Sequence, residues 1–282
     1  MKRYDGRLLK SIGPFSKMVP YIMDKRFDAQ VFAKERVCTD KIDAFLHEKR
    51  DQGYDLSYLH LLLACYVRLL AERPRLNRFI MNRKIYARKG IYISMAVKRA
   101  LHDDADETTL KFAFTGKENI FEIARMVDGK ILECIQDGDQ DKAVKTAEKI
   151  MALPGFTKTI IVGILKSMDR HNMLPKEIIE VSPFHSSLFF SYLKSIKVNY
   201  VYHHLYDFGT AGIFAAAGKV EESPTVENGM IVVRKYCEIG YTVDERICDG
   251  LYFSNSLKLL KKYLNDPHLL ETGLTEIEED VE

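Results

Sequence analysis

The last third of the chain carries a long strand pattern that leads directly into a polar turn and an amphipathic helix. Residues 230–243 are rich in β-branched and aromatic residues. The run is too long to be half-exposed throughout, so we expect a strand from a buried sheet. Residues 251–264 place three leucines on one face of a helix. This strand, turn and helix constrain the C-terminal end of the fold to an α/β arrangement.

Residues 56–73 form the clearest helix pattern, with apolar side chains at helical spacing and Pro74 at its end. The chain has strand patterns toward both ends and helices in its middle and at its end. It lacks the regular strand–helix alternation of a doubly wound sheet, and it has no GxGxxG or GxxxxGK[ST] motif. We therefore expect an α/β fold, a mixed sheet flanked by helices. Further helices are expected at 41–50, 119–135, 141–152 and 156–172, and strands at 83–88, 90–97, 111–114 and 212–217.

Composition excludes several classes of function. The chain has 282 residues and a net charge of +2, which does not favour nucleic acid or a membrane surface as a partner. No apolar run approaches the roughly 20 residues that span a bilayer. The five cysteines are scattered without a CxxC pair, and the first residues lack the apolar core of a signal peptide. We expect a cytoplasmic protein with reduced thiols and no metal site.

Four short segments carry a family resemblance. Residues 18–23 with 26–29 are similar to the opening of a catalytic domain, and residues 73–80 contain Pro74-Arg75-Leu76-Asn77. Residues 191–196 form a serine-containing turn, and residues 245–250 end in Asp-Gly before the last helix. Together, and over about residues 26–270, the chain resembles the chloramphenicol acetyltransferase family and the catalytic domain of 2-oxo acid dehydrogenase complex acyltransferases. The long strand before the Asp-Gly pair and the helix after it make this last segment the most specific.

The resemblance implies a homotrimer with its active sites at the subunit interfaces. Coenzyme A or acyl-coenzyme A enters each site from one side as co-substrate, and the acyl acceptor enters from the other. A His four residues before the Asp removes a proton from a thiol or hydroxyl, which then attacks the thioester. A Ser or Thr hydroxyl stabilises the resulting oxyanion.

Glu245 occupies the position of the catalytic His. A carboxylate in water is a weaker base than an imidazole by about two pKa units, or roughly 3 kcal/mol. Burial could recover part of that difference, which would make Glu245 a poor base. Alternatively, Glu245 is a solvated or Arg246-paired residue in a retired site.

The remaining candidate site residues follow from the same resemblance. Asp249 and Arg26 match a supporting pair, which either orients the Glu245 loop or only fixes a turn. Ser191 matches the oxyanion hydroxyl, with Ser195 second. Lys194 stands where the family usually has Gly, and it either points to solvent or meets a phosphate of coenzyme A.

We expect a single acyltransferase-like domain at residues 1–272, an acidic and flexible tail at 273–282, and no lipoyl or subunit-binding domain. The leading hypothesis is a stand-alone acyltransferase with an altered, weak or inactive site. It would use a small thiol or hydroxyl acceptor. The alternative is a non-catalytic trimeric binding or scaffold protein that retains the fold.

Overall fold

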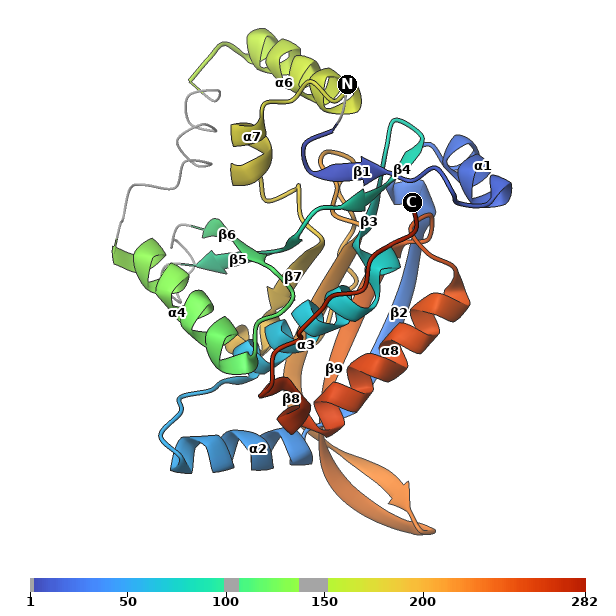
Figure 1. The fold of residues 1–282 in the computed structure, drawn as a ribbon. Coiled ribbons are helices and arrows are strands. Elements are labelled where there is room, and N and C mark those ends of the chain that lie inside the picture. The colour runs from blue at the N-terminus through green and yellow to red at the C-terminus, as the bar shows by residue number, and fades with distance from the viewer. Residues whose placement is uncertain (1–2, 99–106, 137–151) are drawn as a thin grey trace.

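A computed structural model describes residues 3–98, 107–136 and 152–282. Its centre is a six-stranded mixed sheet with the order β2-β9-β8-β7-β5-β6, beside a three-stranded antiparallel sheet with the order β1-β4-β3 (Figure 1). In the larger sheet β7 runs parallel to β5 and β8, and the other pairs are antiparallel. The strands are β1 (Gly6–Leu8), β2 (Gln30–Cys38), β3 (Arg78–Met81), β4 (Lys84–Arg88), β5 (Ile91–Lys98), β6 (Glu107–Phe114), β7 (Leu188–Tyr192), β8 (Ile213–Glu227) and β9 (Met230–Asp244).

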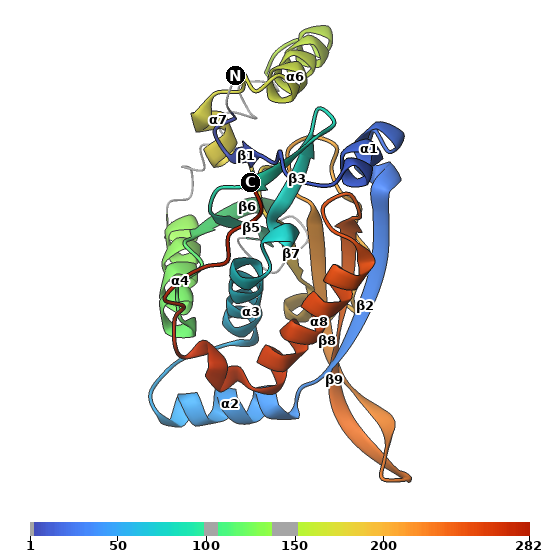
Figure 2. The same ribbon diagram turned by 45° about the vertical axis from the view of Figure 1, so that its right-hand side comes forward.

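Helices cover one face of the large sheet. Helix α3 lies between α4 and α8 and packs against both, while α2 crosses below them (Figure 2). The helices are α1 (Pro14–Ile22), α2 (Asp40–Asp51), α3 (Tyr58–Glu72), α4 (Ile120–Gln136), α6 (Gly155–Arg170), α7 (Lys176–Val181) and α8 (Gly250–Asn265). Short 3₁₀ turns are η1 (Phe27–Ala29), η2 (Pro74–Asn77), η3 (Leu193–Ile196) and η4 (Pro267–Leu270). The mixed α/β fold expected from the sequence is thus confirmed.

Helix α3 is the core of the domain because almost its whole circumference is buried. Its residues from His60 to Ala71 are all buried, and a capping box begins it. The Ser57 Oγ accepts from the backbone N–H of His60, and His60 Nδ1 accepts from the backbone N–H of Ser57. These two bonds satisfy N–H groups that a helix start otherwise leaves unpaired.

A loop crosses the opposite face of the sheet over β8 and β9. A side chain at Gly240 would begin 2.5 Å from the Val201 carbonyl oxygen, and one at Gly218 would begin 2.5 Å from the Tyr200 nitrogen. Only glycine allows the loop backbone to approach the strands this closely. This loop leads from η3, which holds Lys194 and Ser195, to β8.

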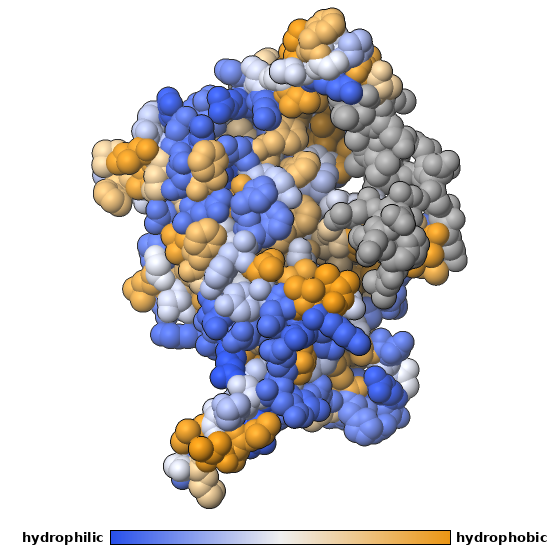
Figure 3. All heavy atoms as spheres, turned by 180° about the vertical axis from the view of Figure 1, so that it is seen from behind, coloured by the Kyte–Doolittle hydropathy of each residue, from blue (hydrophilic) through white to orange (hydrophobic). Residues whose placement is uncertain are grey.

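The distal halves of β8 and β9 project beyond the domain as a two-stranded ribbon (Figures 1 and 2). β9 is exposed or half-buried from Met230 to Tyr236, and it is mostly buried from Cys237 to Asp244. The long strand predicted at 230–243 is confirmed, but its first half is not part of the buried sheet that the sequence led us to expect. Exposed apolar side chains gather at the ribbon tip, where Figure 3 shows an isolated hydrophobic cluster: Val226, Met230, Ile231 and Val233.

The acidic C-terminal tail is docked on the small sheet, which differs from the flexible tail that the sequence suggests. Asp280 receives two hydrogen bonds of 2.6 Å from Arg78, and both side chains are buried. The Glu278 N–H donates to the Ala71 carbonyl, and the last residue accepts from the N–H of Lys10. The sequence suggests a solvated tail because the tail is acidic. Its partner Arg78 lies 202 residues away, so no local pattern shows the ion pair.

The expected elements otherwise agree with the structure at most positions. The helix predicted at 56–73 is α3, and the helix predicted at 251–264 is α8. The strand predicted at 212–217 is the start of the much longer β8, and the helix predicted at 141–152 lies almost wholly outside the described residues. No helix in the described ranges is both long and apolar enough to cross a bilayer.

Candidate active site

The candidate site is built around a buried carboxylate at the end of β9. Asp244 receives hydrogen bonds of 2.7 Å from both Nε and Nη2 of Arg246, so the pair is bidentate. Both side chains are almost fully buried. Such a fork-to-fork pair fixes the plane of both groups. It therefore holds the backbone at the point where β9 turns toward α8.

Arg26 is the second cation on this carboxylate. Its Nε lies 3.6 Å from Asp244 Oδ2, and its Nη2 donates to the carbonyls of Gly209 (3.1 Å) and Ile80 (3.3 Å). Its Nη1 donates to the Tyr206 carbonyl. Burial lowers the pKa of the Arg26 guanidinium, and Asp244 acts in the opposite direction. Arg26 thus ties the start of β2 to β3, to the loop before β8 and to the end of β9.

Glu245 lies between these buried groups but faces the other way. Its backbone N–H donates to the Ala29 carbonyl at 2.9 Å, which fixes its position beside the start of β2. Its side chain is exposed, whereas Asp244 and Arg246 are buried. The backbone turns directly after Asp244, where the Arg246 N–H donates to Asp244 Oδ1 at 3.1 Å, and this turn brings the Arg246 side chain back to Asp244 while Glu245 stays outside. Within the single chain the Glu245 carboxylate is therefore open to solvent.

The expected pair between Asp249 and Arg26 is wrong. Asp249 is the N-cap of α8, and its Oδ1 accepts from the backbone N–H of Tyr252 at 2.8 Å. That bond lowers the pKa of Asp249. The Asp249 side chain is largely exposed, and its Oδ2 lies 3.5 Å from Arg75. A short acidic side chain directly before a helix is a preferred N-cap. Asp249 therefore caps α8 instead of pairing with Arg26.

Ser191 lies on β7, half-buried and far from Glu245 within one chain. It is in register with Ala216 of β8, which is in register with Gly240 of β9, five residues before Glu245. Two strand spacings across and five residues along place the two residues on the order of 20 Å apart. The single chain therefore does not bring the candidate base and the candidate oxyanion donor together.

The turn after β7 holds the two residues expected to bind coenzyme A. Ser195 is exposed, and its hydroxyl donates to the Tyr192 carbonyl at 2.8 Å. The Lys194 ammonium lies 4.3 Å from the centre of the Tyr58 ring, in a cavity that two acidic and two basic side chains share. Coenzyme A binding by these two residues stays a prediction. Lys197 has a φ of 58°, the left-handed conformation that explains why glycine suits this turn.

Sequence reasoning missed Asp244 and Arg246 as members of the buried cluster. A signal was present, because an aspartate side chain at a turn can accept from the backbone N–H two residues later, and Asp-x-Arg places a cation at that position. Within the described ranges, no group of three His, Cys, Asp or Glu side chains could hold a metal ion.

Comparison with known proteins supports the resemblance. Residues 209–272, which span β8, β9, the Glu245 loop and α8, match the sequence model of the 2-oxoacid dehydrogenases acyltransferase (catalytic domain) family. A search of curated proteins finds no match to this chain.

Solved structures share the fold across most of the chain. A probable dihydrolipoamide acetyltransferase from Listeria monocytogenes 4b F2365 superposes with a TM-score of 0.58 at 15% identity, covering 90% of this chain and 93% of that one. The cubic core of a pyruvate dehydrogenase multienzyme complex gives 0.57 at 14%, covering 91% and 88%. A chloramphenicol acetyltransferase gives 0.51 at 14%, covering 92% and 99%. The chain thus has the fold of these acyltransferases, and its resemblance to the 2-oxoacid dehydrogenase acyltransferase catalytic domain is confirmed.

Proposed function

We propose that this chain is a homotrimeric acyltransferase that transfers an acyl group from a coenzyme A thioester to a small thiol or hydroxyl acceptor at a low rate. The observation that carries the proposal is the fixed position of the Glu245 backbone. The bidentate pair of Asp244 and Arg246 and the bond to Ala29 hold this position, which the resemblance assigns to the catalytic base. These contacts support the inference that the scaffold of the site is retained while the base is changed.

The reaction would proceed by direct transfer. The Glu245 carboxylate removes the proton of the acceptor thiol or hydroxyl, and the acceptor attacks the thioester carbon. The Ser191 hydroxyl donates to the oxyanion of the tetrahedral intermediate. The C–S bond then breaks, and the coenzyme A thiolate takes up the proton from Glu245. The weaker basicity of a carboxylate accounts for the low rate.

The distance between Ser191 and Glu245 within one chain supports an assembly of several subunits. Because one chain does not bring the two residues together, a complete site would combine Ser191 of one subunit with Glu245 of its neighbour. A neighbour would also cover Glu245 and remove water from it. We infer further that the protein works in the reducing cytoplasm, in keeping with its five free cysteines.

Calorimetric titration of the purified protein with coenzyme A and with acetyl-coenzyme A tests the proposal, together with sedimentation of the same sample. We expect both ligands to bind and the mass to be three times 32.5 kDa. A monomer that binds neither ligand would contradict the proposal.

The second candidate function is a non-catalytic trimer that binds a ligand or a partner protein. The exposure of Glu245 and the use of Asp249 as a helix cap favour it, because neither carboxylate is then held in a buried reaction site. The two candidates differ in one result. Coenzyme A binding without any acyl transfer, even when a His is restored at position 245, would favour the non-catalytic protein.

A further inference from the structure

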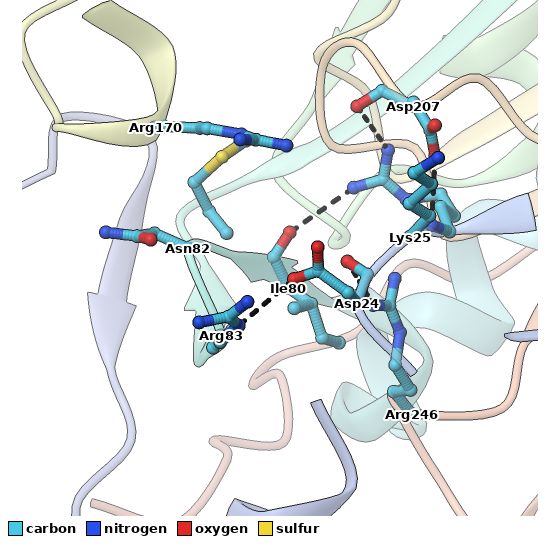
Figure 4. A pocket seen from close by; sticks show the side chains of 10 residues that line it. Asp24, Lys25, Ile80, Asn82, Arg83, Arg170, Asp207 and Arg246 are labelled. Atoms are coloured by element: carbon cyan, nitrogen blue, oxygen red, sulfur yellow. Dashed lines mark hydrogen bonds and ion pairs between the residues drawn. The ribbon is translucent and has the colours of Figure 1, made fainter. Parts of the chain in front are cut away.

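A cavity of about 210 Å³ lies on the outer side of the buried arginine cluster, and it carries an excess of positive charge. Segments far apart in the sequence form it: the residues after α1, the β3–β4 turn, the end of α6 and the loop after β9. Figure 4 shows Arg170 reaching in from one side, with Arg246 on the other. Five basic side chains line the cavity, Lys25, Arg26, Arg83, Arg170 and Arg246, against two acidic ones, Asp24 and Asp207.

The acidic side chains around this cavity are already engaged. Asp24 pairs with Arg83 at 3.0 Å, and Asp207 accepts from the backbone N–H of Arg26 at 2.9 Å. Asp244, which lies behind the cavity, takes both guanidinium contacts of Arg246. Arg170 has no acidic partner at ion-pair distance among the residues that the structure describes. Its charge is therefore available to a ligand.

The floor of the cavity makes this charge effective. Arg26 and Arg246 are buried, and both guanidinium groups are held in place by Asp244. Charges in such a poorly solvated site interact more strongly with an anion than charges on an open surface. The guanidinium fork also matches the oxygens of a carboxylate or phosphate. At about 210 Å³ the cavity is below the usual range for drug-sized ligands, which suits a compact anion.

We propose that this pocket is a binding site for a small phosphate- or carboxylate-bearing molecule, separate from any coenzyme A site. Arg170 and Lys25 contact the anion directly, above the Arg26–Asp244–Arg246 cluster. Because Arg246 follows Glu245, a bound anion also restrains the Glu245 loop. The site does not depend on acyl transfer and would exist in a non-catalytic protein as well.

Calorimetric titration of the full chain with inorganic phosphate, and separately with succinate, at low ionic strength tests this site. The variant Arg170→Gln removes the charge at the pocket. The matched control Lys166→Gln removes one charge from the same exposed helix, four residues away and outside the pocket. We expect binding to the native chain, a loss of about tenfold in affinity in Arg170→Gln, and a change below about twofold in Lys166→Gln.

Each outcome of the titrations decides the proposal. Binding of either probe with the expected loss in Arg170→Gln supports the site, and the probe that binds more tightly names the chemical class. Equal weakening by both variants would mean attraction to net charge alone and would overturn the proposal. So would the absence of binding to the native chain, or displacement of phosphate by coenzyme A. Acetyl transfer is measured separately with acetyl-coenzyme A, so a failure of the proposed reaction is distinguishable from a failure of this site.

Discussion

Arg26 and Asp244 form the buried ion pair at the centre of this fold, with the Arg26 Nε 3.6 Å from the Asp244 Oδ2. Each residue comes from a different end of the chain, and β2 pairs with β9 directly beside them. Arg246 completes the cluster from the other side of Asp244. The pair therefore joins the N-terminal edge strand to the loop that carries Glu245.

Replacing Asp244 should destabilise the protein far more than replacing Asp249. Asp244→Asn leaves Arg26 and Arg246 buried without a charge partner, so we expect a loss of about 3–5 kcal/mol in the free energy of unfolding. Asp249→Ala removes only a helix cap and should cost about 1 kcal/mol. Urea denaturation of both variants measures the difference. Equal losses would contradict the assignment of Asp244 as the partner of Arg26.

Neutralising Asp280 should release the C-terminal tail. Asp280→Asn leaves the buried Arg78 without its carboxylate, and we expect a loss of about 3 kcal/mol with faster digestion of the tail by carboxypeptidase. Glu279→Gln is the matched control, because it removes the same charge from the exposed neighbour. If both variants behave alike, the tail is not anchored through Arg78.

The free energy of unfolding should rise with pH above about 7 because of Lys111. Burial lowers the pKa of Lys111 to about 7, while its ammonium donates to the carbonyls of Ile179 and Ser182. A lysine in the unfolded chain titrates near 10.4, so between these values the unfolded chain binds more protons than the folded one. Stability then increases with pH by up to about 1.4 kcal/mol per unit.

The measurement is the difference in unfolding free energy between the native chain and Lys111→Met, followed from pH 7 to 8.5. We expect this difference to shift in favour of the native chain as pH rises. Lys258→Met, at an exposed position on α8, is the control and should give a difference independent of pH. A flat difference for Lys111→Met as well would mean that Lys111 titrates normally.

Local patterns were sufficient to predict the long helices and several strands, but not α1, α7, β2, β3 or β7. The helical spacing of apolar residues in α3 and the apolar residues in the second half of β9 are visible in the sequence because those side chains pack in the core. The outer half of β8 was missed, since this part of the ribbon pairs only with β9 and includes Pro224, Glu221 and Glu222. A ribbon that is exposed on both faces has no hydrophobic alternation to detect.

The site was predicted only in part, because its contacts join residues far apart in the chain. Glu245 and Asp249 could be found from their motif, but the partner of Arg26 could not. Asp244 and Asp249 were both possible partners for Arg26. Only the structure shows that Asp244, at the end of β9, pairs with Arg26 and that Asp249 caps α8 instead. The anion pocket gave no signal in the sequence, since its basic residues are scattered from Lys25 to Arg246.

The most direct test of the central account is the rate of acetyl transfer from acetyl-coenzyme A to a small thiol by the native chain, Glu245→His and Glu245→Gln. The account predicts slow transfer by the native chain and a gain of roughly 10²-fold in Glu245→His, because imidazole is the better base at neutral pH. It predicts no transfer by Glu245→Gln, which keeps the shape but not the basicity. Equal rates in all three proteins would contradict the account, because Glu245 would then have no role as a base.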